Sequence, residues 1–139
     1  MSDSLSTFKD WCREAFRFLV EQHGFTVVQK GQQYNQYYVL FGHGDVRLGI
    51  LGEGYGTVAT IHYLTRSGFE VPYQCVAEDW QPALGKHKKR RKQQASQREQ
   101  IFQSAKIIAE RDQDILRGDL FRVDFAAQRL QAIYERLRG

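Results

Sequence analysis

Residues 37–50, "YYVLFGHGDVRLGI", decide the fold of this chain, because they predict two β-strands joined by a tight turn. Apolar side chains recur at every second position on both sides of the turn: Tyr37, Val39 and Phe41 before it, and Val46, Leu48 and Ile50 after it. A period of two is typical of strands with one covered face. The "GHGD" between them, Gly42–Asp45, is typical of a hairpin turn, because glycine adopts the positive φ that such turns need. The stretch therefore predicts an antiparallel hairpin.

The same period continues on both sides of this hairpin and predicts a meander. We expect strands over residues 25–30, 34–41, 46–51 and 57–63, joined by short loops and therefore antiparallel. Residues 68–72 predict an additional edge strand, since Pro72 cannot donate to a central ladder.

Helical periodicity flanks the predicted sheet. Residues 7–24 predict one helix, with Thr7 as its N-cap and Gly24 as its left-handed stop. A long helix is expected from about residue 88 to Gly118, and Asp124 is expected to cap a shorter last helix. The predicted fold is α+β: an N-terminal helix, an antiparallel four- to five-stranded meander, then one long and one shorter C-terminal helix, as a single domain over residues 1–139.

Composition places the chain among folded, non-membrane proteins. Of its 139 residues, 42% are hydrophobic and 13% aromatic, which is typical of a globular domain. No apolar run approaches the ~18 residues of a membrane span. The N-terminal "MSDSLSTFKDWC" lacks the basic and apolar regions of a secretory signal, and two cysteines make no disulfide framework. We therefore expect a cytoplasmic protein with two free thiols and no membrane contact.

The net charge of +4 is unevenly distributed. Residues 1–85 carry a net −3 and residues 86–139 a net +7. Six positive charges lie within Lys86–Lys92, "KHKKRRK", so the chain has one concentrated basic segment.

The glycine-rich stretch "ILGEGYGTVAT", residues 50–60, resembles the phosphate loop of a protein kinase. The spacing is one residue short of G-x-G-x-x-G-x-V, the residues after Val58 are "ATIHY" with no lysine where the phosphate-pairing lysine of a kinase belongs, and no H-R-D triplet occurs in the chain. A dinucleotide-binding fingerprint would have to open a helix, whereas strands are predicted on both sides here. We interpret the stretch as a hairpin tip that exposes Glu53 and Tyr55.

No catalytic or metal-binding pattern stands out. The sequence has no G-x-S-x-G, no H-E-x-x-H and no C-x-x-C. His43 and His62, together with Asp45, are the sole set that suggests a small metal site. The two histidines lack a third ligand at a recognised metal-binding spacing. We expect no cofactor, no metal and no catalytic residue, and an enzymatic function stays unsupported.

The basic segment has three interpretations. It is a solvated helix start, a nucleic-acid contact, or a contact for an acidic protein partner. Phosphate binding by its lysines and arginines would be salt-dependent, and Tyr37, Tyr38 and Tyr63 would offer stacking platforms on the sheet. Cations at a helix N-terminus oppose the helix dipole, so either the segment is kept for a partner or the helix starts later.

Three stretches together resemble small bacterial immunity proteins that accompany polymorphic or contact-dependent toxins. They are "FRFLVEQHGF", "YYVLFGHGDVRLGI" and "DILRGDLFRVD", which cover about a quarter of the chain. The resemblance implies a non-catalytic protein that masks the active surface of a toxin, and it assigns no functional residue. Many nuclease inhibitors are acidic, whereas this chain is acidic over its first 85 residues alone.

Our leading hypothesis is therefore a non-catalytic protein-binding module, with an immunity protein that neutralises a cognate toxin as its specific form. The alternative is a nucleic-acid-binding domain that uses Lys86–Lys92 and the sheet tyrosines. The residues expected to bind a partner are His43, Glu53, Tyr55, Lys88, Lys89, Arg90 and Arg91.

Overall fold

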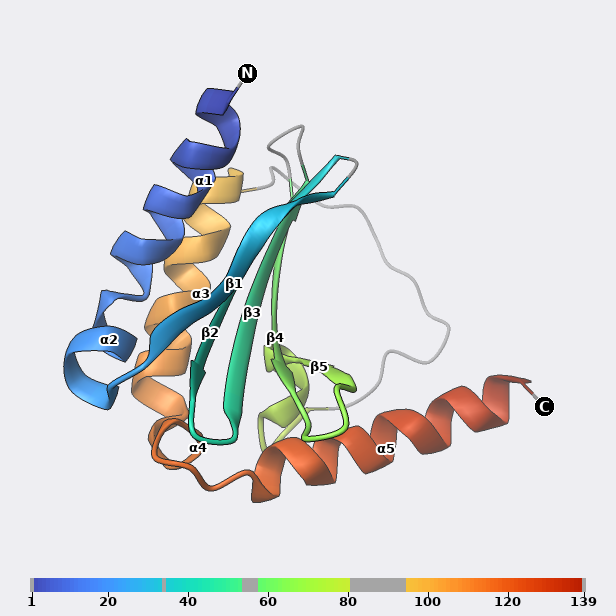
Figure 1. Cartoon of the computed structure of the whole chain (residues 1–139). Coiled ribbons are helices and arrows are strands. Elements are labelled where there is room, and N and C mark those ends of the chain that lie inside the picture. Colours follow the sequence, from blue (N-terminus) through green and yellow to red (C-terminus); the bar gives the residue numbers. More distant parts are fainter. Residues whose placement is uncertain (1, 34, 54–57, 81–94, 139) are drawn as a thin grey trace.

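A computed structural model describes residues 2–33, 35–53, 58–80 and 95–138. Its helices are α1 (Ser2–Ala15), α2 (Arg17–His23), the 3₁₀ helix η1 (Tyr73–Val76), α3 (Gln97–Arg111), α4 (Gln113–Leu116) and α5 (Phe121–Arg138). Its strands are β1 (Thr26–Gln33), β2 (Gln36–His43), β3 (Val46–Glu53), β4 (Ala59–Leu64) and β5 (Glu70–Pro72). The predicted α+β fold is confirmed, with a five-stranded sheet between N-terminal and C-terminal helices (Figure 1).

The sheet is an antiparallel meander in the order β1-β2-β3-β4-β5. The central hairpin pairs His43 with Val46, so its turn is two residues, and Gly44 adopts a φ of 57°. This is the short loop that the twist of adjacent antiparallel strands favours. The predicted edge strand is also confirmed, since β5 pairs with β4 alone and carries Pro72 at its end.

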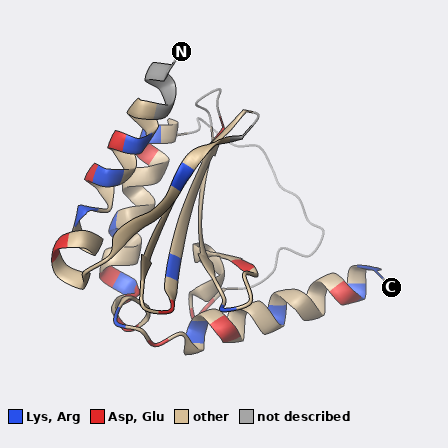
Figure 2. Ribbon diagram, in the orientation of Figure 1, with Lys and Arg blue, Asp and Glu red and all other residues tan. Residues whose placement is uncertain are grey.

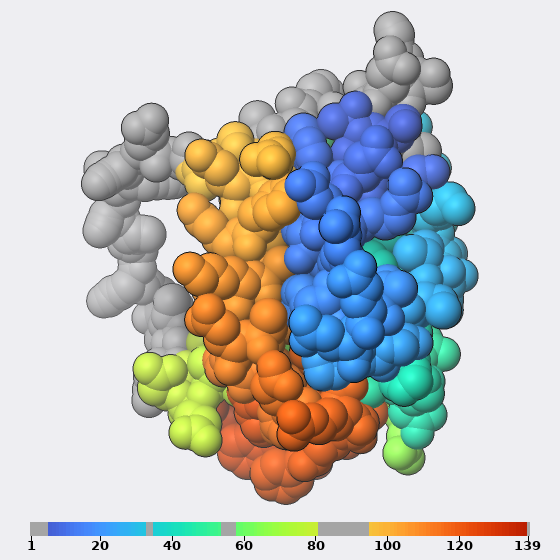
Figure 3. Space-filling model, turned by 90° about the vertical axis from the view of Figure 1, so that its left-hand side faces the viewer, coloured from blue at the N-terminus to red at the C-terminus, as the bar shows by residue number. Residues whose placement is uncertain are grey.

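One face of the sheet is covered by α1 and α3, which lie side by side (Figures 1 and 3). The buried side chains of this layer are Phe8 and Cys12 of α1, Phe16 between α1 and α2, Tyr37, Val39 and Phe41 of β2, Val46, Leu48 and Ile50 of β3, Ile61 and Tyr63 of β4, and Ile101, Ala105 and Ile108 of α3. The alternating apolar residues predicted to share a face, from Tyr37 to Ile50, thus lie against the helices.

The N-terminal helix differs from the prediction. It begins at Ser2, so Thr7 lies inside α1 rather than at its N-cap. The helix also breaks at Phe16, which has φ −105° and ψ 23° and a fully buried ring that packs against Phe41. Gly24 is confirmed as the left-handed stop, with φ 76° at the end of α2.

The C-terminal helices begin at different residues from those predicted. Helix α3 starts at Gln97, because Ser96 and Glu99 form a reciprocal capping box that fixes its first turn. The basic segment 86–92 lies outside the described residues and is separated from α3 by Ala95 and Ser96, which are not helical. The last helix is capped by Asp119, whose carboxylate accepts the Phe121 N–H at 3.0 Å, so the predicted cap Asp124 lies within α5.

The glycine-rich stretch joins two paired antiparallel strands, so its interpretation as a hairpin is confirmed. Gly52 pairs with Ala59, and the Glu53 N–H donates to the Val58 carbonyl at 3.1 Å. The side-chain amide of Gln97 at the start of α3 donates to the carbonyls of both Glu53 and Val58. These bonds attach the base of the hairpin to the helix layer.

Candidate protein-binding surface

The second face of the sheet is turned away from α1 and α3 and carries half-exposed apolar side chains. We call it the open face and define it by Gln29, Tyr38, Leu40, Gly49, Leu51, His62, Leu64 and Glu70. These residues alternate along the strands with the buried residues of the covered face. They line a shallow depression of about 250 Å³. Figure 2 shows that most charged residues lie on helices and near strand ends, so the middle of the sheet is largely uncharged.

The polar groups of the open face bond to one another. The Gln29 side-chain amide donates to the Tyr38 hydroxyl at 3.3 Å, and His62 Nε2 lies 3.7 Å from a Glu70 carboxylate oxygen. Burial lowers the pKa of His62 below its ordinary value of 6.5, and the Glu70 charge opposes this shift without reversing it. His62 is therefore neutral at pH 7, and an apolar partner would meet no histidine charge there.

Gly49 lies under the His62 ring. A Cβ built at Gly49 would stand 2.8 Å from His62 Nε2, closer than a normal contact. The glycine therefore allows the imidazole to lie against β3, which keeps this part of the open face shallow.

Helix α5 extends from the sheet on the side of the open face (Figure 1). Its last buried residue is Leu130, and the remaining turns carry exposed apolar side chains. Tyr134 packs against Phe69, in the turn before β5, with ring centroids 6.2 Å apart. Large apolar side chains left exposed on α5 are Phe121, Phe125, Tyr134 and Leu137. Helix α5 thus supplies a second apolar surface beside the sheet.

Among the described residues, a cluster of charged side chains surrounds Asp112. This carboxylate is fully buried and accepts hydrogen bonds from Arg111 at 2.6 and 2.8 Å, from Arg122 at 3.0 Å and from the Tyr63 hydroxyl at 2.8 Å. The same arginines donate to the carbonyls of Tyr73 and Val76. Burial, followed by the Asp112 charge, raises the pKa of Tyr63, so its hydroxyl stays a donor.

This cluster connects β4, η1, α3, α4 and α5, and its partners are all satisfied. The adjoining cavity of about 650 Å³ is lined by three further carboxylates, those of Glu78, Asp79 and Asp114. No serine, cysteine or histidine is among the residues that line it. The arrangement stabilises the joint between the helices and the sheet.

Two of the residues predicted to bind a partner, His43 and Glu53, lie at opposite ends of the central hairpin. His43 ends β2 and packs on Phe25, with ring centroids 5.5 Å apart, whereas Glu53 ends β3 at the opposite end of the hairpin. Seven residue steps along the ladder separate the two ends, about 24 Å in an extended strand. Tyr55 and the basic residues Lys88, Lys89, Arg90 and Arg91 lie outside the described residues.

The histidine site suggested by the sequence does not form either. Asp45 pairs with Arg66 at 3.1 Å and His62 with Glu70, while His43 lies at the hairpin turn. Across the part of the chain that the structure describes, no group of three or more His, Cys, Asp and Glu residues is placed to hold a metal ion.

The three tyrosines expected as stacking platforms do not share a face. Tyr37 is buried against the Phe8 ring at 5.7 Å, and Tyr63 is fully buried with its hydroxyl on Asp112. Neither can stack on a ligand, so this part of the nucleic-acid hypothesis is wrong. Tyr38 alone of the three lies on the open face.

Both cysteines are free, as predicted, and both are buried. Burial raises the pKa of the Cys12 thiol far above its ordinary range, and it raises that of Cys75 against the opposing charge of Arg129. Both stay protonated at neutral pH and are poor nucleophiles.

Two of these features were missed by sequence reasoning for different reasons. Alternation separates the residues of each strand into two sets, but it does not tell which set the helices cover, so Tyr38 and Leu40 could not be assigned to an exposed face. Asp112 had a visible signal, because it falls on the apolar stripe of the predicted long helix: Ile101, Ala105, Ile108, Asp112 and Ile115 follow one another at 4/3/4/3 spacing. A carboxylate on such a stripe indicates a buried ion pair.

Within the described ranges, none of the helices is both long and apolar enough to cross a membrane. Comparison of the chain with protein-family models, with curated proteins and with solved structures gives no match.

Proposed function

We propose that the chain is a non-catalytic protein-binding module that holds a folded protein partner on its open face. The observation that carries the proposal is a five-stranded sheet covered by helices on one side, whose other side presents half-exposed Tyr38, Leu40, Leu51 and Leu64. An apolar sheet surface of this kind is typical of an interaction site.

The chemistry of the open face favours a mainly apolar partner surface. Glu70 is the one acidic residue among those that define the face, and at the end of the face the Arg47 guanidinium donates to the carbonyls of Gly44 and Val46 at 2.7 and 2.9 Å. Nucleic acid would require cations directed outward to its phosphates. Masking of a toxin's active surface, which the resemblance to immunity proteins implies, is one specific form of this function.

The proposal is tested by placing a photo-crosslinking residue at Leu51 in the full chain and irradiating it in an extract of the source cells. We expect one protein adduct of defined mass, and we expect it to disappear when Leu40→Asp is added. The matched control places the same crosslinker at Val20, which is 48% exposed on α2.

An identical adduct from both positions would show non-specific contact and overturn the proposal. Recovery of nucleic acid instead of protein at Leu51 would also overturn it and favour the nucleic-acid hypothesis. Purified adduct partner should then bind the unmodified chain at one-to-one stoichiometry, and binding should weaken at least about tenfold with Leu51→Asp but not with Val20→Asp.

A further inference from the structure

Strand β1 is an edge strand and leaves one side of its backbone without a neighbouring strand in the sheet. From Gln29 to Gln33 it pairs residue by residue with β2, so its last five residues form a regular template. Val27 and Val28 on this strand are 36% and 47% exposed. A long edge with exposed β-branched residues is a site at which another extended chain can pair.

A bulge in β1 sets the direction of Lys30. The register shifts between Val27 and Gln29, so that Val27 pairs with Phe41 and Lys30 pairs with Val39. Phe41 and Val39 both belong to the covered face, and therefore Val27 and Lys30 also point to the helix side, although they are three residues apart. Without the bulge, Lys30 would point to the open face. Bulges commonly redirect a side chain in this way.

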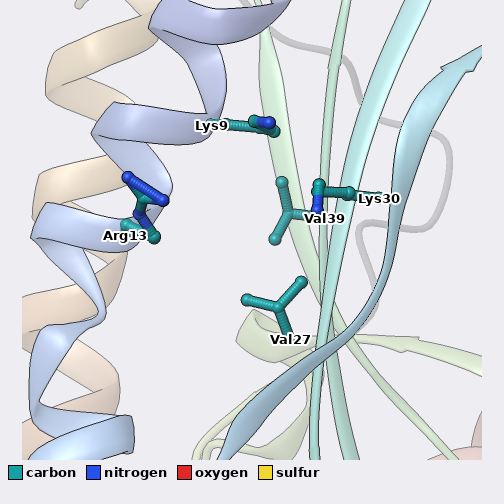
Figure 4. A pocket seen from close by; sticks show the side chains of 5 residues that line it. All are labelled: Lys9, Arg13, Val27, Lys30 and Val39. Carbon is teal, nitrogen blue, oxygen red and sulfur yellow. The ribbon is translucent and has the colours of Figure 1, made fainter.

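Helix α1 supplies two further cations to the same place. Its aromatic residues pack over β2, with the Phe8 ring against Tyr37 and the Phe16 ring 5.9 Å from Phe41, so β1 lies outside this contact. Lys9 and Arg13, one helical turn apart, line the gap that remains between α1 and β1. We call this gap the edge groove: a hollow of about 130 Å³ lined by Lys9, Arg13, Val27, Lys30 and Val39 (Figure 4).

The edge groove combines an apolar floor with positive charge. In Figure 4, Lys9 extends from the helix and Lys30 from the strand toward the space above Val39. Arg13 makes an exposed pair with Asp10 at 3.4 Å, and no carboxylate among the described residues lies within ion-pair distance of Lys9 or Lys30. Three cations and no acidic residue line the groove. Such a site attracts a segment with carboxylates.

We propose that an extended acidic segment of a protein partner adds to the free edge of β1 as a sixth strand. Its backbone bonds to Gln29–Gln33, and every second side chain, a carboxylate, faces Lys9, Arg13 and Lys30 in the edge groove. This is a different surface from the open face, and it is tested with a synthetic peptide, so its failure leaves the proposed function untouched.

The test measures binding of a fluorescein-labelled eight-residue peptide of alternating Glu and Val to the full chain by fluorescence anisotropy. Alternation puts all four carboxylates on one side of the extended peptide. We expect saturable binding that weakens as salt is raised from 50 to 500 mM. The variant K9E/K30E should weaken binding at least about tenfold. The milder variant K9Q/K30Q should lose less affinity for the peptide than K9E/K30E. It keeps the test decisive if K9E/K30E fails to fold.

The matched control is K106E/R136E, which changes exposed cations on α3 and α5. Both double reversals lower the formal net charge from +4 to zero, so a difference between them reports the position of the charge. The control should bind within about twofold of the unchanged chain. A second control is the same peptide with N-methyl groups on the alternate backbone amides that would donate to β1. It keeps the carboxylates but loses these donors, and it should not bind.

Three results would overturn the proposal. Equal losses in K9E/K30E and K106E/R136E would indicate general charge attraction, including attraction to Lys86–Lys92. Unchanged binding of the methylated peptide would exclude strand addition. Absence of peptide binding, with self-association of K30V but not of the unchanged chain in analytical ultracentrifugation, would show that Lys30 and the bulge only protect the edge from a second copy.

Discussion

The two faces of the sheet are built from the same strands by the same alternation, yet their side chains differ in burial and in hydrogen bonding. On the covered face, Tyr63 is fully buried and hydrogen-bonded to a buried carboxylate, whereas on the open face Tyr38 is half-exposed and bonds to Gln29. The covered face buries its apolar side chains against the helices, and the open face leaves its own half-exposed. Paired substitutions, one on each face, can test this division.

The largest effect is expected at the buried carboxylate behind the covered face. Asp112→Ala removes the buried carboxylate that Arg111, Arg122 and Tyr63 all bond and leaves two partly buried cations without it, so we expect the free energy of unfolding to fall by about 3–5 kcal/mol. Asp114→Ala removes a partly exposed partner of Arg122 and should cost at most about 1 kcal/mol. Urea unfolding of both variants checks this, and equal losses would contradict the importance of burial.

The two tyrosines should respond differently to loss of the hydroxyl. Tyr63→Phe removes one of the donors to Asp112 and should cost about 1.5–3 kcal/mol. Tyr38→Phe removes an exposed bond to Gln29 and should change the stability by less than about 0.5 kcal/mol. Thermal and urea unfolding measure both. A Tyr38→Phe variant as unstable as Tyr63→Phe would mean that the open face is covered in solution.

Two glycines of β3 offer the same comparison with a single added methyl group. At Gly52, on the covered face, a Cβ would lie 2.4 Å from the Phe8 ring, so Gly52→Ala should cost about 1–3 kcal/mol through overpacking. At Gly49 the nearest atom belongs to the His62 ring, which can turn toward solvent, and Gly49→Ala should be nearly neutral. Chemical denaturation measures the free energy of unfolding of both variants. A larger loss in Gly49→Ala than in Gly52→Ala would show that Phe8 has room to move.

The smallest effect concerns pH. Because the pKa of His62 is lowered in the folded chain, the unfolded chain binds a proton first as the pH falls below the ordinary value of 6.5. His62 therefore weakens the fold as pH falls through this range, and its effect is absent well above pH 6.5. The loss of stability between pH 7.5 and 5 should be smaller in His62→Gln than in the unchanged chain. Identical pH profiles of the two proteins would contradict this assignment.

Much of the fold could be predicted from local patterns. Alternation in residues 37–50 predicted the hairpin and its two faces, Gly24 predicted a helix stop, and Pro72 predicted an edge strand. The predicted first residues of the helices were less accurate. The capping box at Ser96 and Glu99 was present in the sequence, but the charged run before it also has helical composition and extended the predicted helix by about nine residues.

The candidate surfaces were mostly not predictable. The edge groove depends on which side of β1 the bulge turns Lys30, and a bulge leaves no clear signal in "TVVQKGQQ". The predicted contact residues His43 and Glu53 were grouped because both lie near turns, but a hairpin has two ends, and eight-residue strands hold them far apart.

The sequence by itself determined the order of helices and strands and which residues of the central hairpin share a face, because alternation and turn chemistry are local properties of the chain. The tertiary structure decided which face the helices cover, that Asp112 is enclosed by two arginines and Tyr63, and that Lys9, Arg13 and Lys30 line one groove. These outcomes depend on side chains distant in sequence packing together, and local periodicity carries no information about such contacts.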